Sequence, residues 1–158
     1  MLLGDIAEIK TGMVLTRKKV EFPKDVKATY RLITLKNITE NGILNDEPFE
    51  EFQSNDVLNS QHFTENGDVL SRLSFPYTAI HIHEATAGLL VPSYFAIIKV
   101  DSLKFLPEYI AWYLNTDEVK KELERSQAGT RIPSTNKTAL SAIPIVGIPL
   151  TKQQAIVN

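Results

Sequence analysis

The chain of 158 residues is 43% hydrophobic and 23% charged, which is typical of one globular domain with a substantial core. It has no cysteine, so disulfide bonds and thiolate metal sites are excluded. No apolar run approaches the ~20 residues that a membrane-spanning helix needs. Residues 1–5 lack the features of a signal peptide, so we expect none.

The net charge is −2, from 17 basic and 19 acidic residues, which is low for a nucleic-acid-binding domain. The charges are unevenly distributed, however. Between Asn37 and Ser71 there are eight acidic residues and no lysine or arginine, so the remainder of the chain carries a net charge of +6. Such a chain can present one positive face to DNA. Alternatively, the acidic block is only a solvated surface.

The first 42 residues predict a short helix or strand over residues 3–12 and a strand over residues 30–38, where apolar side chains alternate. The dipeptide Asn41-Gly42 predicts a tight turn after that strand. Between the two elements lies a basic surface loop that either attracts phosphates non-specifically or aids solubility. Its basic residues are Arg17, Lys18, Lys19, Lys24 and Lys27.

Residues 43–66 are acidic and irregular, with a short helix expected near residues 59–63 and a turn at residues 66–68. Strands are predicted over residues 69–74 and 77–84. In the second strand, His81 and His83 lie on one face. Two such side chains are compatible with metal binding, but no third ligand lies nearby. A half-exposed strand with its polar face outwards is therefore the favoured interpretation.

The next segment predicts a short apolar strand before residue 94, a buried strand over residues 94–100 and two helices. Pro107 is typical of the first turn of a helix, and the apolar residues after it recur at helical spacing. Asn115 and Glu118 form a capping-box-like start for a second helix over residues 116–126. We expect Trp112 to lie in the core rather than to act as a base-stacking platform.

The stretch from residue 127 to 145 is rich in side chains that bind anionic oxygens. Gly129 can end the preceding helix, and Pro133 stiffens the loop. Alternatively, the loop is a capped turn in which Ser134 or Thr135 begins a helix near residues 138–142. A short apolar strand is predicted to follow, within residues 143–150. The polar and basic side chains of the loop are Thr130, Arg131, Ser134, Thr135, Asn136 and Lys137.

Several of these segments together resemble the target recognition domain of the DNA-specificity (S) subunits of type I restriction-modification systems. Residues 3–12 resemble that family's opening motif, and Gly67-Asp68-Val69-Leu70 resembles one of its strands. Near the end, an Ile-Pro strand follows a polar turn, and the pattern Pro-Leu-x-x-Gln-x-x-Ile begins at Pro149. The resemblance covers nearly the whole chain.

The resemblance implies one α+β domain, with a twisted, mainly antiparallel sheet flanked by helices. Residues 1–150 would form the DNA target recognition domain, and residues 151–158 would begin a truncated spacer helix. The domain would read one half of a bipartite duplex site in the major groove. It would be cytoplasmic, as the absence of cysteine allows, and would direct methyltransferase and restriction subunits. A second recognition domain or a homodimer would supply the other half.

The resemblance also suggests which side chains approach DNA, and these are Lys36, Asn37, Arg72, Ser74 and Tyr77 in addition to the polar loop. Arginine suits guanine and asparagine suits adenine in the major groove. Alternatively, Asn37 caps a turn and Arg72 pairs with the acidic block. No catalytic residue, metal or cofactor is expected, because no cofactor loop or methyltransferase signature is present. A metal-dependent nuclease using His81 and His83, and a protein-interaction module, remain alternatives.

Overall fold

The computed structural model describes residues 1–45, 47–126 and 135–158. Within these residues, four strands form a central antiparallel sheet. The strand order is β1 (Ala7–Thr11), β6 (Phe95–Val100), β4 (Asp68–Arg72) and β5 (Ala79–His81). The predicted α+β class and the antiparallel pairing are therefore confirmed.

Both faces of this sheet are buried at β4 and β6, which explains the nearly continuous apolar sequence of β6. Adjacent residues of a strand point to opposite faces. Val69 and its partner Ile98 pack towards α2 (Pro107–Leu114), whereas Leu70 and its partner Ile97 pack against the loops that cover the other face. The sheet thus separates two apolar clusters.

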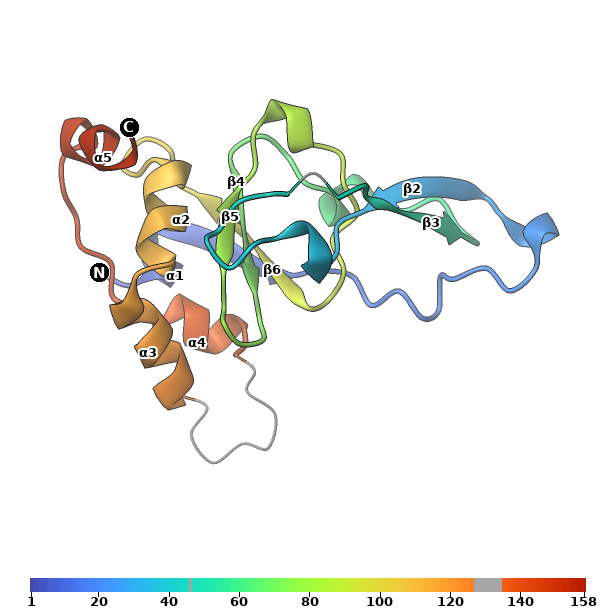
Figure 1. The fold of residues 1–158 in the computed structure, drawn as a ribbon, viewed down its shortest axis with the longest axis horizontal. Helices are drawn as coiled ribbons and strands as arrows, with labels where there is room; N and C mark the ends of the chain where they lie inside the picture. The colour runs from blue at the N-terminus through green and yellow to red at the C-terminus, as the bar shows by residue number, and fades with distance from the viewer. Residues whose placement is uncertain (46, 127–134) are drawn as a thin grey trace.

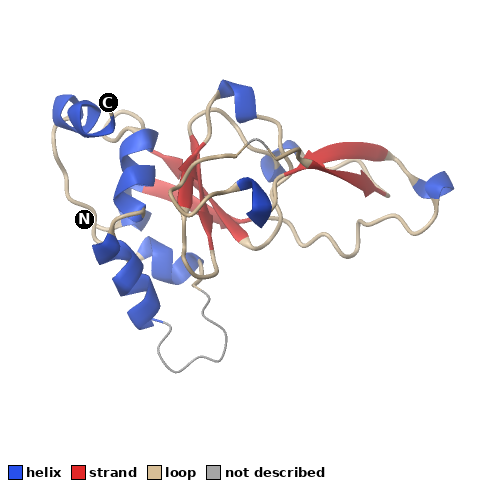
Figure 2. Ribbon diagram, viewed as in Figure 1, coloured by secondary structure: helices blue, strands red, loops and turns tan. Residues whose placement is uncertain are grey.

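The helices gather at one end of the molecule (Figures 1 and 2). Besides α2, they are α1 (Leu3–Ile6), α3 (Asp117–Ser126), α4 (Lys137–Ser141) and α5 (Leu150–Val157). Helix α2 contacts β4, β5 and α5, and α4 contacts α1 and β1. In the part of the chain that is described, no helix has the length and apolar character needed to cross a membrane.

A two-stranded antiparallel ribbon projects from the opposite end (Figure 1). It consists of β2 (Ala28–Leu32) and β3 (Glu50–Ser54), and the short 3-10 helix η1 (Pro23–Asp25) lies near its far end. We call residues 16–32 and 50–56 the arm. Strand β3 lies inside the acidic block and was not predicted, because its partner is far away in the sequence.

The strand predicted over residues 30–38 is too long, since β2 ends at Leu32. The 3-10 helix η2 (Leu35–Asn37) follows. The side-chain oxygen of Asn37 accepts a hydrogen bond from the backbone nitrogen of Thr34 at 2.9 Å and so closes the turn. This local side-chain bond competes with strand pairing. The turn predicted at Asn41-Gly42 is present, with Gly42 at a φ of 78°.

Three other predicted strands are shorter than expected or absent. After β5, His83 begins the 3-10 helix η4 (Glu84–Thr86). Residues 143–148 form no strand in a sheet, because pairing is limited to an isolated bridge between Pro144 and Leu2. Proline lacks the N–H group that would extend such a ladder. Residues 89–93 likewise form only isolated bridges. The short helix expected near residues 59–63 is η3 (Ser60–His62).

Trp112 was predicted to lie in the core, and this prediction is wrong. Its side chain is 46% exposed. Ile110 and Leu114 form part of the buried face of α2, and a residue two positions from Ile110 points about 200° away from it around a helix. Trp112 instead stacks on Tyr109, with a distance of 5.8 Å between the ring centroids.

Two buried amide side chains join distant segments of the fold. The fully buried Gln153 of α5 accepts from the Leu106 nitrogen at 2.8 Å and donates to the carbonyl oxygens of Lys104 and Ile148 at 3.0 and 2.9 Å. Asn115, which was predicted to cap α3, instead bonds to the backbone of Ala79 in β5. These contacts fix α5 and α2 against the rest of the domain.

Candidate nucleic-acid interface

The β4–β5 hairpin and the start of α4 meet at one end of the central sheet. The backbone nitrogen of Thr135 donates a hydrogen bond to the carbonyl oxygen of Leu73. This bond brings together two groups of predicted site residues, those at the end of β4 and those at the end of the polar loop. We call the exposed and half-exposed residues around it the hairpin surface, and they are Arg72, Ser74, Phe75, Asn136 and Lys137.

The turn of the hairpin buries one of its two aromatic side chains and leaves the other exposed, although their rings contact each other edge to face with centroids 6.0 Å apart. Tyr77 has a φ of 58° and is almost completely buried, whereas Phe75 is 55% exposed. The Phe75–Pro76 peptide bond is cis, and the nitrogen of Tyr77 donates to the carbonyl oxygen of Ser74 at 2.8 Å. Burial raises the pKa of Tyr77. Tyr77 therefore supports the turn from inside, and Phe75, which was not predicted as a site residue, lies outside.

Arg72 is positioned by the hairpin itself. Its Nη2 donates to Ser74 Oγ at 3.3 Å and to the carbonyl oxygen of Phe75 at 3.2 Å. In the described ranges, no carboxylate lies within 4.0 Å of its guanidinium group. The alternative prediction, an ion pair between Arg72 and the acidic block, is thus not supported there.

The predicted helix after the polar loop is present as α4, but Asn136 begins it instead of Ser134 or Thr135. The side-chain oxygen of Asn136 accepts from the Ala139 nitrogen at 2.9 Å, a typical N-cap contact. Lys137 follows with an exposed side chain, while Thr135 is buried. Thr130, Arg131 and Ser134 lie outside the described residues.

The two predicted residues of η2 differ in exposure. Lys36 is exposed and pairs with Glu50 at 2.9 Å. Asn37 is fully buried, and its amide also donates to the carbonyl oxygen of Glu47 at 3.1 Å. The geometry of Asn37 matches the alternative in which it caps a turn, and we leave it out of the interface that we propose below.

Tyr94 connects these two regions and was not predicted as a site residue. Its carbonyl oxygen accepts from the Leu73 nitrogen at 3.1 Å, and its side chain is partly exposed. Burial raises the pKa of Tyr94, and the charge of Glu50 raises it further. Glu50 is the residue that pairs with Lys36. The sequence feature that could have indicated Tyr94 is its place as an aromatic residue directly before a buried strand.

The two histidines of the β5 region do not form a metal site with their neighbours. His81 Nε2 lies 3.1 Å from Glu108 Oε1, and the rings of His81 and His83 are 6.4 Å apart. Burial lowers the pKa of His81 by more than the charge of Glu108 raises it. Among the residues that the structure describes, no group of three potential ligands could hold a metal ion. This geometry gives the nuclease alternative no support.

No protein-family model and no curated protein matches this chain. Solved structures do match it. One is the crystal structure of an HsdS subunit from Thermoanaerobacter tengcongensis, with a TM-score of 0.72, 18% identity and coverage of 99% of this chain. Another is described as the structural basis of complex assembly and conformational transition of the type I R-M system, with a TM-score of 0.74, 17% identity and the same coverage.

The chain spans only 39% of the length of each of these two proteins. At this level of identity, the likeness establishes a shared fold. The resemblance predicted from the sequence is confirmed at that level. In its fold, this chain is therefore similar to about two fifths of an HsdS subunit of a type I restriction-modification system.

Proposed function

We propose that this chain is a DNA target recognition domain that reads one half of a bipartite duplex site in the major groove. The observation that carries the proposal is the junction of the β4–β5 hairpin with α4, which gathers arginine, lysine, amide and aromatic side chains within a fold shared with HsdS subunits. Side chains of this kind are suited to both bases and phosphates.

Arg72 is the residue that we propose for base recognition. A guanidinium group can donate two hydrogen bonds to guanine in the major groove. Its contacts with Ser74 and Phe75 restrict the side chain before DNA arrives, which lowers the entropic cost of binding. The exposed ring of Phe75 is suited to contact with a thymine methyl group.

Lys137 and Lys36 are the residues that we propose for phosphate contacts. Both side chains are exposed, and contacts of lysine with phosphate fix the orientation of a protein on the duplex without reading its sequence. Lys36 must exchange its partner Glu50 for phosphate. Exposed ion pairs of this type contribute little to stability, so the exchange costs little.

In this proposal, methylation and cleavage are performed by partner modification and restriction subunits, and the chain itself is not an enzyme. The similarity to a structure from the assembled type I R-M system supports such partners. Residues 1–150 act as the recognition domain, and α5 begins a spacer helix. A second recognition domain or a second copy reads the other half of the site.

Selection from randomised duplexes at low salt tests the proposal with the full chain. We expect one short sequence to be enriched and binding to weaken steeply with salt. Arg125→Ala, on α3, where the arginine pairs with Glu122, is the matched control for Arg72→Ala. No enriched sequence at any salt concentration, or turnover of DNA by the chain alone, contradicts the proposal.

A further inference from the structure

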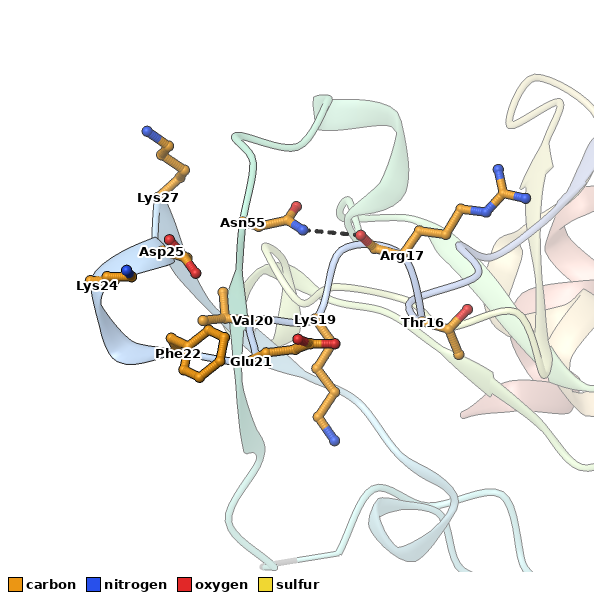
Figure 3. Close-up of a pocket in the computed structure, with 10 residues that line it drawn as sticks. All are labelled: Thr16, Arg17, Lys19, Val20, Glu21, Phe22, Lys24, Asp25, Lys27 and Asn55. Atoms are coloured by element: carbon orange, nitrogen blue, oxygen red, sulfur yellow. Dashed lines mark hydrogen bonds between the residues drawn. The ribbon is translucent and has the colours of Figure 1, made fainter.

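The far end of the arm contains an open cleft of about 700 Å³ (Figure 3). It has no part in the hairpin surface, because it is formed by the loop before β2 and the end of β3. Four of the residues that line it are basic, two are acidic, and Phe22 is 57% exposed. The basic residues are Arg17, Lys19, Lys24 and Lys27.

Backbone contacts hold the two sides of this cleft in place. The nitrogens of Val20 and Lys27 donate to the carbonyl oxygens of Gln53 and Ser54 at 3.2 and 2.8 Å. Asn55 adds two contacts, from its backbone nitrogen to the Lys18 oxygen at 2.9 Å and from its side chain to the Arg17 oxygen at 3.0 Å. The basic loop is therefore attached to β3 along its length.

The basic side chains at this end of the arm are available to an external partner. Lys18 pairs with Asp56 at 2.8 Å. The four basic residues of the cleft are exposed, and within residues 1–45, 47–126 and 135–158 none of them has a carboxylate within 4.0 Å. At the other end of the ribbon, Glu50 is paired with Lys36. The cleft at the far end of the arm is thus lined by four basic side chains that have no carboxylate partner among the described residues.

The directions of these side chains favour an extended partner over a small anion. Figure 3 shows Lys19 and Lys27 pointing to opposite sides of the arm. Side chains that diverge in this way cannot converge on one phosphate group. Glu21 and Asp25 also line the cleft, and their charges disfavour a small anion inside it. Two separate rows of negative charge match this arrangement.

A groove of duplex DNA has such rows, because a phosphate backbone runs along each side of it, and the major groove admits a two-stranded β-ribbon. We infer that the arm enters a groove of the same duplex, beyond the base pairs that the hairpin surface reads, and contacts phosphates of both strands. This inference rests on the proposed function. A strand of five residues such as β2 spans about 17 Å, which corresponds to about five base-pair steps. The arm therefore lengthens the contact with DNA without adding base recognition.

The inference is tested with the triple variant Lys19→Ala, Lys24→Ala, Lys27→Ala in the full chain. Its matched control is Lys104→Ala, Lys121→Ala, Lys152→Ala, which removes three exposed lysines at the helical end of the molecule. Affinity for a randomised duplex pool is measured between about 50 and 200 mM salt. We expect the dependence of log affinity on log salt to become shallower by about 0.9 for each lost phosphate contact. The control should leave this dependence unchanged.

The enriched sequence separates this inference from the proposed function. The triple variant should enrich the same sequence as the wild type, because the arm contacts no base edges, while Arg72→Ala should change the preference.

An unchanged salt dependence in a folded triple variant, verified by its circular dichroism and melting temperature, overturns the role of the arm. A protein partner on the arm predicts that same unchanged dependence. If the wild type enriches no sequence, the proposed function fails, and the salt dependence still reports on the arm.

Discussion

The side-chain amide of Asn115 forms two hydrogen bonds with the backbone of a single residue, Ala79. Its nitrogen donates to the Ala79 carbonyl oxygen and its oxygen accepts from the Ala79 nitrogen, both at 2.8 Å. Strand β5 lies at the edge of the sheet, so Asn115 occupies the place of a neighbouring strand at that position. A loop residue after α2 thus completes the edge of the sheet that carries the β4–β5 hairpin.

Replacing Asn115 by aspartate should destabilise the domain by about 1–3 kcal/mol, because a carboxylate cannot donate to the Ala79 carbonyl oxygen and leaves it without a partner. Unfolding by urea gives the change in free energy. Asn41→Asp adds the same charge at an exposed turn and should change stability by less than about 0.5 kcal/mol. Equal effects of the two substitutions would show that the paired hydrogen bonds are unimportant.

Replacing Lys99 by methionine should destabilise the domain by about 1–3 kcal/mol, because the buried Asp68 side chain would lose its ion pair with Lys99 Nζ, at 2.8 Å. The expected loss is smaller than for a fully buried pair, since the Lys99 side chain is 29% exposed. Chemical unfolding at neutral pH measures it. Lys104→Met, at an exposed position, is the control.

The same pair predicts a dependence of stability on alkaline pH. Burial opposes the charged form of Lys99, but its hydrogen bond with Asp68 and the charges of Asp68 and Glu65 outweigh burial and raise its pKa. The stabilisation is therefore complete below the ordinary pKa of 10.5 and is lost as pH rises through the raised value. The difference in unfolding free energy between wild type and Lys99→Met should shrink above pH 10.5. A constant difference would contradict the pairing.

His81 predicts the opposite trend on the acid side. Because burial lowers its pKa below 6.5, the unfolded chain binds a proton more readily than the folded chain. Stability is therefore complete above pH 6.5 and falls as pH drops through the lowered value. His81→Gln should reduce this loss in thermal melts recorded at several pH values. His62 contributes with the same sign, since burial also lowers its pKa, so part of the loss should remain.

Arg72→Ala and Lys137→Ala should affect DNA binding in different ways. Loss of Arg72 should cost about 1–3 kcal/mol at one base pair and relax the preference there, whereas loss of Lys137 should weaken binding to all sequences and reduce the salt slope by about 1. Binding of the selected duplex and of its single-base variants measures both effects. A uniform loss from both substitutions would refute the division between base and phosphate contacts.

The sequence predicted those elements whose pattern is local. Strands β4 and β6 and helix α2 were found because apolar runs or helical periodicity mark them, and α3 was found from a capping-box-like pattern at its start. Strand β3 was missed because its acidic sequence forms a strand only by pairing with β2, which lies some twenty residues earlier. The burial of Tyr77 also depends on packing between distant segments. Of the predicted site, Arg72, Ser74, Asn136 and Lys137 lie around one junction, and whether they bind DNA stays a prediction.

Gln153 gives α5 a mechanical connection to the rest of the domain. One side chain holds the segment before α2 through Lys104 and Leu106, and the segment before α5 through Ile148. Tilting α5 therefore requires three hydrogen bonds to break together. A pull or twist applied to α5 is transmitted to the base of α2, and through Asn115 to the edge strand of the sheet.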